Sequence, residues 1–254
     1  MSGMVLDLFK LDGRVALVTG AGRGIGQALA LGLAQAGAEI ACVTRTGNSA
    51  ETKRLVEACG RRFVDLKADL GVPEQRKGLA DRVVAELGRL DILVNNAGVT
   101  GRYPPEDYPE DAWRNLMEVH LHAAFDLAVQ ASQHMDGGGK IVNIGSVMSF
   151  QGGLHISAYA SAKHAIAGLT KSLATSWAPR GINVNCICPG YVETELAEAL
   201  QKDPVRGPQI LQRIPAGRWG KPEELAGLCV FLASDAASFM HGSCVVIDGG
   251  WLAR

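Results

Sequence analysis

Three side chains able to handle a proton lie close together in the chain, between Ser146 and Lys163. Tyr159 and Lys163 are four residues apart at the start of a segment typical of a helix, so both side chains lie on one helix face. Ser146 directly follows 140–145, whose alternating, β-branched pattern predicts a short buried strand. The carboxyl end of such a strand is where an α/β sheet binds ligands. We therefore expect a hydroxyl, a phenol and an ammonium to converge on one point.

This set of groups favours proton transfer to or from a substrate oxygen. A phenol is a poor base because its unperturbed pKa is near 10, but a neighbouring ammonium favours its anion. We therefore expect Lys163 to lower the pKa of Tyr159 toward the working range, while Ser146 hydrogen-bonds the same substrate oxygen. The alternative is a helix surface pair that arose by chance, and only the rest of the chain decides between the two.

A glycine-rich turn near the start of the chain indicates a nucleotide site. The apolar strand 14–19 is followed by the turn GAGRGIG and then by a helical segment. In this context glycines let a backbone approach a pyrophosphate that lies on the helix N-terminus. The alternative is tight packing alone, and the order strand, turn, helix favours a dinucleotide. The four glycines of the turn are Gly20, Gly22, Gly24 and Gly26.

The end of the second predicted strand, 38–44, bears on the choice of dinucleotide. An acid at this position holds the ribose 2′-hydroxyl of NAD, whereas a nearby arginine accommodates the 2′-phosphate of NADP. Here Thr44 ends the strand and Arg45 follows it, and Arg23 of the glycine turn could reach the same phosphate. The charges favour NADP, and NAD stays open because both arginines could simply be solvated. At the end of the third strand, 61–70, Asp69 could meet the adenine amino group.

The remaining pattern predicts one doubly wound α/β domain over 1–254, with seven parallel strands and helices on both faces. Strands alternate with helices up to about residue 95, which predicts right-handed crossovers in a parallel sheet. Single helices are expected over 73–88 and 111–135. The segment 191–220 is polar and broken by Pro and Gly, as is typical of a mobile lid over a substrate pocket.

Composition excludes several classes of function. The net charge is −1, the pI is about 6.6 and no dense cluster of Lys and Arg occurs, so a nucleic-acid partner is not expected. No basic leader precedes a long apolar run, and no run of 18 apolar residues occurs, so we expect a cytoplasmic protein without a membrane partner. The hydrophobic fraction of 47% is enough for a sizeable core.

The cysteines and histidines do not have the spacing of a metal site, so no metal is expected. None of the six cysteines forms a C-x-x-C pair, and most lie in apolar segments, so we interpret them as reduced core residues. Cys186 and Cys188 lie on one face of the sixth strand, without zinc-site spacing.

With these motifs in order, the chain resembles the classical short-chain dehydrogenase/reductase family over essentially its whole length. The matching motifs are GAGRGIG, NNAG, YASAK with a serine thirteen residues before its tyrosine, and PG after the sixth strand. The resemblance implies hydride transfer between a nicotinamide and a secondary alcohol or ketone, with Ser146, Tyr159 and Lys163 as catalytic residues, and a homotetramer. The family's cofactor contacts fall on Gly20, Arg23, Ile25, Asp69, Leu70, Asn95, Ala97, Gly98, Tyr159, Lys163, Pro189, Gly190, Val192 and Thr194. The glycine turn and the end of the second strand add Gly24, Gly26, Thr44 and Arg45 to the predicted cofactor site.

One position departs from the family pattern. Where an asparagine usually stands in the long helix, this chain has His120. His120 could hold a water or relay a proton, and its pKa near 6.5 would then add a titration in the physiological range. The alternative is a core histidine without a catalytic part.

The segments FQGG, RIPAGRWG and DGGWLAR resemble the branch of the family that oxidises sugar acids of the deoxy-gluconate type. A carboxylate substrate calls for a cation, and the candidates are Arg102, His155 and Arg218. Two alternatives stay open: a reductase of another carbonyl substrate, such as a 3-oxoacyl group, a polyol or a sugar, and a catalytically silent regulator that senses dinucleotides.

Overall fold

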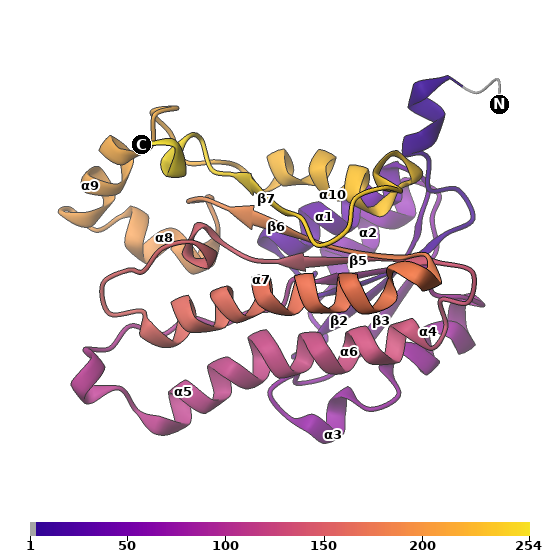
Figure 1. The fold of residues 1–254 in the computed structure, drawn as a ribbon, viewed down its shortest axis with the longest axis horizontal. Helices are drawn as coiled ribbons and strands as arrows, with labels where there is room; N and C mark the ends of the chain where they lie inside the picture. The colour runs from indigo at the N-terminus through magenta and orange to yellow at the C-terminus, as the bar shows by residue number, and fades with distance from the viewer. Residues whose placement is uncertain (1–3) are drawn as a thin grey trace.

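Seven parallel strands form one sheet in the computed structural model, which describes residues 4–254 (Figure 1). Their order is β3-β2-β1-β4-β5-β6-β7, and every neighbouring pair is parallel. This confirms the predicted doubly wound architecture. The strands are β1 (Val15–Thr19), β2 (Glu39–Thr44), β3 (Phe63–Lys67), β4 (Ile92–Asn95), β5 (Gly139–Ile144), β6 (Ile182–Pro189) and β7 (Cys244–Ile247).

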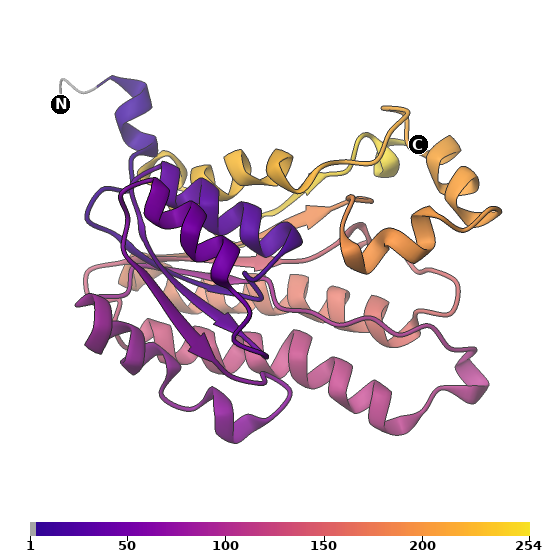
Figure 2. The same ribbon diagram turned by 180° about the vertical axis from the view of Figure 1, so that it is seen from behind.

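Helices cover both faces of the sheet (Figures 1 and 2). One face carries α1 (Gly24–Gln35), α2 (Ala50–Ala58) and α10 (Ala226–Ala233), and the other carries α4 (Leu79–Leu87), α6 (Ala123–Ser132) and α7 (Ser157–Trp177). Because successive side chains of a strand point to opposite faces, β1 sends Ala16 and Val18 into the first core and Val15 and Leu17 into the second. Both faces of the central strands are therefore apolar, as parallel sheets require.

Two helices that we predicted as continuous are interrupted. The segment expected over 73–88 forms α3 (Pro73–Arg76) and α4, because Gly78 between them adopts a left-handed φ of 70°. The segment expected over 111–135 forms α5 (Glu110–Met117), a π-helical turn (Glu118–His122) and α6. A π turn inside an α-helix inserts an extra residue and is frequent at functional sites.

The strand order reverses between β1 and β4, where one connection leads to the β2 side and the other to the β5 side. The carboxyl ends of both strands face the same edge, and such a switch point opens a crevice between the diverging connections. The predicted glycine turn, NNAG and Ser146 all follow strands at this edge. The topology therefore brings the separate motifs of the sequence together.

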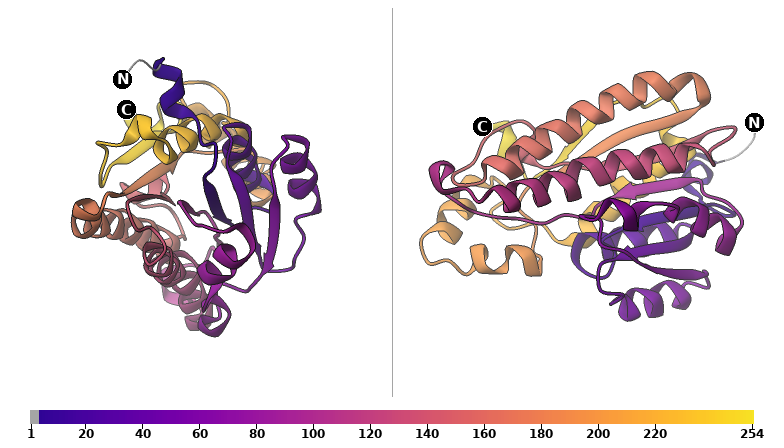
Figure 3. Two further views of the ribbon diagram at one scale, coloured as in Figure 1. Left: turned by 90° about the vertical axis from the view of Figure 1, so that its right-hand side faces the viewer. Right: turned by 90° about the horizontal axis from the view of Figure 1, so that it is seen from below.

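The segment 191–220 projects beyond the carboxyl edge of the sheet, at the far end from the 3₁₀-helix Val5–Phe9 (Figure 1). It contains α8 (Glu195–Gln201) and α9 (Arg206–Arg213). Its two ends are joined by a bridge between Val192 and Gly220, where the Glu193 amide donates to the Gly220 carbonyl at 2.8 Å. The right-hand view of Figure 3 shows how α8 and α9 stand apart from the layered body.

Short 3₁₀-helices link the main elements, and no helix within residues 4–254 is both long and apolar enough to span a membrane. The further 3₁₀-helices are Pro105–Asp107, Val147–Ser149, Ala178–Arg180, Pro222–Leu225, Asp235–Ala237 and Trp251–Ala253.

Candidate active site

A cavity of about 350 Å³ opens at the carboxyl edge of the sheet. Its walls come from the start of α1, from the ends of β4, β5 and β6, from α7 and from the segment 191–220. The structure thus brings together residues that are far apart in the chain. The site residues predicted from the sequence that line it are Gly20, Arg23, Gly24, Ile25, Gly26, Gly98, Arg102, His120, Ser146, Tyr159, Lys163, Pro189, Gly190, Val192 and Thr194.

Ser146, Tyr159 and Lys163 meet at the floor of this cavity. The Ser146 hydroxyl caps the 3₁₀-helix Val147–Ser149 by accepting from the Met148 amide at 3.1 Å. Lys163 is 4% exposed, and its Nζ donates to the Ile144 carbonyl at 2.6 Å. The same Nζ lies 5.5 Å from the centre of the Tyr159 ring. The start of α7 therefore presents both side chains to the end of β5.

The protonation of this trio differs from our expectation. Burial raises the pKa of Tyr159, and the neighbouring Ser146 hydroxyl only partly opposes the rise. Lys163 does not offset this rise in the structure described here, because its Nζ hydrogen-bonds to a carbonyl of β5. The expected lowering of the Tyr159 pKa by Lys163 stays a prediction for the protein with its dinucleotide bound. Burial also lowers the pKa of Lys163 to about 8, because its ammonium has lost water without gaining a carboxylate.

His120 lies against Tyr159. It belongs to the π turn Glu118–His122, is 5% exposed, and its ring packs edge-on against the Tyr159 ring at 5.5 Å between centres. Its Nε2 lies 2.7 Å from the Val99 carbonyl oxygen. A Cβ at Gly98 would lie 2.6 Å from the imidazole Cε1, so the glycine of NNAG makes room for this ring.

The expected titration of His120 near neutral pH is wrong. Burial lowers its pKa to about 3, and the Lys163 ammonium adds to this effect. The imidazole is therefore neutral throughout the physiological range. It can position neighbouring groups by hydrogen bonding, but it does not supply a second titrating proton at neutral pH.

The start of α1 fits the pyrophosphate of a dinucleotide. Arg23 occupies the N-cap position, and no side chain caps the helix, so its first amides stay available to an anion. Gly24 adopts a left-handed φ of 57°, and the nearest atoms to a Cβ placed there belong to Thr194, at 3.6 Å. At Gly24 the turn thus leaves space in front of a helix N-terminus. Gly20, Gly22 and Gly26 are instead required by close packing, because a Cβ on each would lie 2.9, 2.5 and 2.3 Å from a backbone atom.

The residues predicted for the adenosine half lie outside the wall of the cavity. Thr44 is buried, and its hydroxyl accepts from the Gly47 amide at 3.0 Å, while Arg45 is exposed. Asp69 accepts from the Gly71 amide at 2.9 Å. Arg23 lines the cavity, but its guanidinium forms an ion pair with Glu195 of α8.

The residues around NNAG brace the sheet ends. Asn95 donates from Nδ2 to Asn143 Oδ1 at 2.9 Å and to the Ala124 carbonyl at 3.2 Å, which ties β4 to β5 and to α6. Leu70, Asn95 and Ala97 line a second, much smaller cavity behind the first one, which His120 and Lys163 also line. These side chains therefore support the floor from behind.

Only one of the three cations predicted for a substrate carboxylate reaches the cavity. Arg102 lines it, and partial burial together with the nearby Arg206 guanidinium lowers the pKa of Arg102. His155 is exposed, with an unusual left-handed φ of 59°, and does not line the cavity. Arg218 is bound to Glu224 through two contacts of 2.6 and 2.7 Å and also lies outside the wall.

One wall of the cavity is aromatic and was not predicted from the sequence. Tyr191 and Trp219 line the cavity with their ring centres 5.2 Å apart, and Tyr191 also packs against Trp251 of the C-terminal turn at 4.7 Å. Arg213 stacks on Trp251 at 3.9 Å. Tyr191 directly follows Pro189 and Gly190 at the end of a strand, and this position could have indicated a residue in the wall of the cavity. Aromatic faces suit the C–H faces of a sugar chain as well as apolar substrates.

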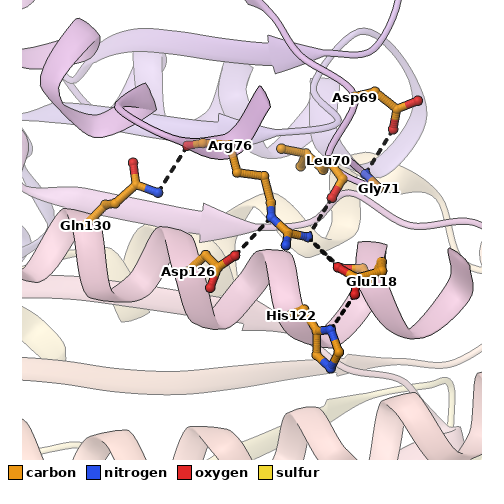
Figure 4. A network of polar contacts seen from close by, with 8 residues as sticks. All are labelled: Asp69, Leu70, Gly71, Arg76, Glu118, His122, Asp126 and Gln130. Carbon is orange, nitrogen blue, oxygen red and sulfur yellow. Dashed lines mark hydrogen bonds and ion pairs between the residues drawn. The ribbon is translucent and has the colours of Figure 1, made fainter. Parts of the chain in front are cut away.

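A buried arginine ties the loop after β3 to the helix that carries His120 (Figure 4). Arg76 is 3% exposed and lies 2.9 Å from both Glu118 Oε2 and Asp126 Oδ2. It also donates to the Leu70 carbonyl at 2.9 Å. Glu118 begins the π turn, so this network fixes the turn that places His120 in the floor of the cavity.

Comparison with known proteins places these features in context. A family model described as enoyl-(acyl carrier protein) reductase matches residues 20–252. A 2-dehydro-3-deoxy-D-gluconate 5-dehydrogenase of Bacillus subtilis (strain 168) is 47% identical over 254 residues, which cover 99% of this chain and 100% of the relative. A gluconate 5-dehydrogenase of Gluconobacter oxydans (strain 621H) is 41% identical, with 96% of each chain covered.

A solved structure is similar over the whole fold. The crystal structure of a gluconate 5-dehydrogenase from Burkholderia cenocepacia J2315, in complex with NADP and tartrate, has a TM-score of 0.94 and 42% identity. The match covers 99% of this chain and 100% of that protein.

Proposed function

The chain belongs to the short-chain dehydrogenase/reductase family, and from this premise we propose that it is an NAD(P)-dependent oxidoreductase of sugar acids. It interconverts a secondary alcohol and a ketone on a substrate of the gluconate or deoxy-gluconate type. The observation that carries this proposal is the convergence of Ser146, Tyr159 and Lys163 on a cavity that begins at an uncapped helix N-terminus.

In the proposed mechanism, Tyr159 moves a proton between its phenolic oxygen and the substrate oxygen. Ser146 donates a hydrogen bond to the same oxygen and so fixes its position in front of the phenol. A bound nicotinamide supplies or accepts the hydride. Because the pKa of Tyr159 is raised by burial, the phenol needs a cation close by in order to act as a base. Lys163 supplies it when its ammonium turns from the Ile144 carbonyl toward the bound ligand.

Dinucleotide binding is proposed for the start of α1 and the ends of the strands around it. Arg45 is exposed at the end of β2, which supports a contact with a 2′-phosphate and so a preference for NADP. Arg23 contributes only if it leaves Glu195, so Arg45 is the stronger candidate. The Burkholderia cenocepacia relative, solved with NADP, is consistent with this preference.

Arg102 is proposed as the ligand of the substrate carboxylate. It is the one predicted cation that lines the cavity, and its lowered pKa still leaves a guanidinium charged at neutral pH. The names of the sugar-acid relatives, and the tartrate bound by one of them, support a carboxylate substrate. Arg218 is a weaker candidate because Glu224 already neutralises it, and His155 is weaker because it lies outside the wall of the cavity.

Three further features of the prediction belong to this proposal. The whole chain, 1–254, acts as one domain in which 191–220 closes over the substrate, and the protein is a cytoplasmic homotetramer. Apolar side chains exposed on the helices and at the β7 edge support assembly: Trp113 at 37%, Phe125 at 45%, Phe239 at 98% and Val246 at 38%. Sedimentation of the purified protein measures its mass directly, and a monomer at all concentrations would remove the assembly from the proposal.

The test of function is a set of turnover assays that follow nicotinamide absorbance. NADP and NAD are each titrated against sugar acids, the corresponding neutral sugars and 3-oxoacyl thioesters. We expect turnover with sugar acids and a lower KM for NADP than for NAD. In the Arg102→Met variant, we expect mainly a higher KM for the sugar acids.

Each alternative has its own outcome in the same assays. Turnover of thioesters but not of sugar acids would identify a 3-oxoacyl reductase in place of a sugar-acid dehydrogenase. Tight dinucleotide binding without turnover of any substrate would identify a dinucleotide-sensing regulator instead. Equal KM values for acids and neutral sugars would remove Arg102 from its proposed role.

A further inference from the structure

Three cysteine side chains meet behind the catalytic serine. Cys186 and Cys188 point to the same face of β6, and Cys244 of β7 pairs in register with Cys186. Their sulfur atoms all lie within 4.8 Å of one another, with 3.7 Å between those of Cys186 and Cys188. The sequence placed only two of these thiols together, because Cys244 comes from a distant strand.

The surroundings of the trio are apolar. Cys186 and Cys188 are fully buried and pack with Ala124, Ile166 and partly buried Leu121 and Leu169, whereas Cys244 is half-buried. Within residues 4–254, none of the six cysteines forms a disulfide. No fourth His, Cys, Asp or Glu of the described chain joins the cluster. The site thus offers three sulfurs and no hard ligand.

This geometry matches a three-coordinate metal ion. Three sulfurs bonded in a plane at about 2.3 Å from one ion lie about 4 Å from one another. The observed spacings lie around this value, so an ion would need only small side-chain movements. Structural zinc sites are almost always four-coordinate, whereas soft thiolates without a fourth ligand favour monovalent copper.

We propose that Cys186, Cys188 and Cys244 form a binding site for one Cu(I) ion. As each copper–sulfur bond forms, the thiol concerned releases its proton to solvent. The ammonium groups of Lys163 and Lys171 interact electrostatically with these sulfurs and so offset part of the negative charge of the metal–thiolate group. The half-buried Cys244, at the edge of the sheet, is the point of entry.

The site touches the catalytic floor through Gly145. A Cβ at Gly145 would lie 2.8 Å from Cys186 Sγ and 2.9 Å from Cys188 Sγ, so no free space separates the thiols from this residue. Gly145 lines the cavity and directly precedes Ser146. Even the small sulfur movements that an ion requires therefore act on the end of β5, and turnover falls in proportion to the metal bound.

The test is an anaerobic titration of the reduced full-length protein with Cu(I), in competition with a coloured Cu(I) chelator. We expect one ion per chain and an X-ray absorption spectrum with three sulfur neighbours. Cys244→Ser should lower the affinity at least about a hundredfold, since one of three metal bonds is lost. The matched control is Cys59→Ser, a half-buried cysteine in another part of the fold, which should bind like the wild type.

Four results would overturn the proposal: less than one ion per chain, a spectrum with two or four sulfur neighbours, tighter binding of zinc than of Cu(I), or an equal loss in Cys59→Ser and Cys244→Ser. If Cys244→Ser does not fold, Cys188→Ser takes its place. The expected fall in turnover rests on the proposed function, whereas metal binding does not, so the two fail separately.

Discussion

Two cations are buried almost equally in this protein, but only one of them is neutralised by carboxylates. Arg76, 3% exposed, lies between the carboxylates of Glu118 and Asp126. Lys163, 4% exposed, has a carbonyl as its hydrogen-bond acceptor and no ion pair in the described chain. A neutralised cation holds elements together, whereas an unneutralised one keeps its charge adjustable and its donors available to a ligand. The neutralised cation lies beneath the π turn, and the unneutralised one lies in the floor of the cavity.

The largest expected effect is on turnover in Lys163→Met. The variant should lose about 10²–10⁴-fold in kcat, because the phenol of Tyr159 then has no cation to favour its anion. Steady-state assays measure this loss. Lys171→Met, the same change on an exposed position of α7, is the control and should leave kcat within a few per cent of wild type. A loss in both variants would show that α7 itself was disturbed.

Because of the same lysine, we expect the free energy of unfolding to rise at alkaline pH. Its pKa is about 8 in the folded protein, against 10.5 for an ordinary lysine, so between these two pH values the unfolded chain binds the proton that the folded one lacks. The free energy of unfolding therefore rises with pH across this window, by up to about 3 kcal/mol relative to Lys163→Met. Urea unfolding at several pH values measures the difference. A constant difference would mean that the buried lysine titrates normally.

For Arg76→Met we expect the reverse pattern: reduced stability with little change in the chemical step. The free energy of unfolding should fall by about 2 kcal/mol, below the range for fully buried pairs because Glu118 and Asp126 are partly exposed. Arg54→Met, which removes an exposed ion pair with Glu51, should cost less than about 0.5 kcal/mol. If Arg76→Met kept full stability, the proposed distinction between the two buried cations would be lost.

At neutral pH the smallest expected effect is that of His120→Asn. A loss of less than about tenfold in kcat is expected, because a general acid or base normally contributes 10²–10⁴-fold and a neutral imidazole supplies no proton of its own at neutral pH. The wild type should also lose stability relative to the variant as pH falls from 6.5, by about 1.4 kcal/mol per unit, because only its unfolded state takes up the proton. Loss of most turnover with dinucleotide still bound would show that the imidazole has its own task.

Regular patterns in the sequence predicted the sheet and the meeting of Ser146, Tyr159 and Lys163 at one cavity. β-branched strands, glycine turns and the spacing of Tyr159 and Lys163 are local features, and the topology then brings them to one edge. The π turn was not predictable, because the apolar spacing of Glu118–His122 fits an α-helix equally well. The directions in which the pKa values of Tyr159 and His120 shift depend on burial by residues distant in the chain. The meeting of Cys244 with the thiols of β6 depends on the pairing of β7 with β6.

The joined ends of 191–220 have a consequence for how far this segment can vary in length and sequence. Because Val192 and Gly220 already hold each other, the backbone between them is closed at its base independently of what it contains. Lengthening such an excursion twofold costs only about 0.6 kcal/mol in closure entropy. Exchanging this stretch between relatives would therefore change one wall of the cavity and leave the sheet unaltered.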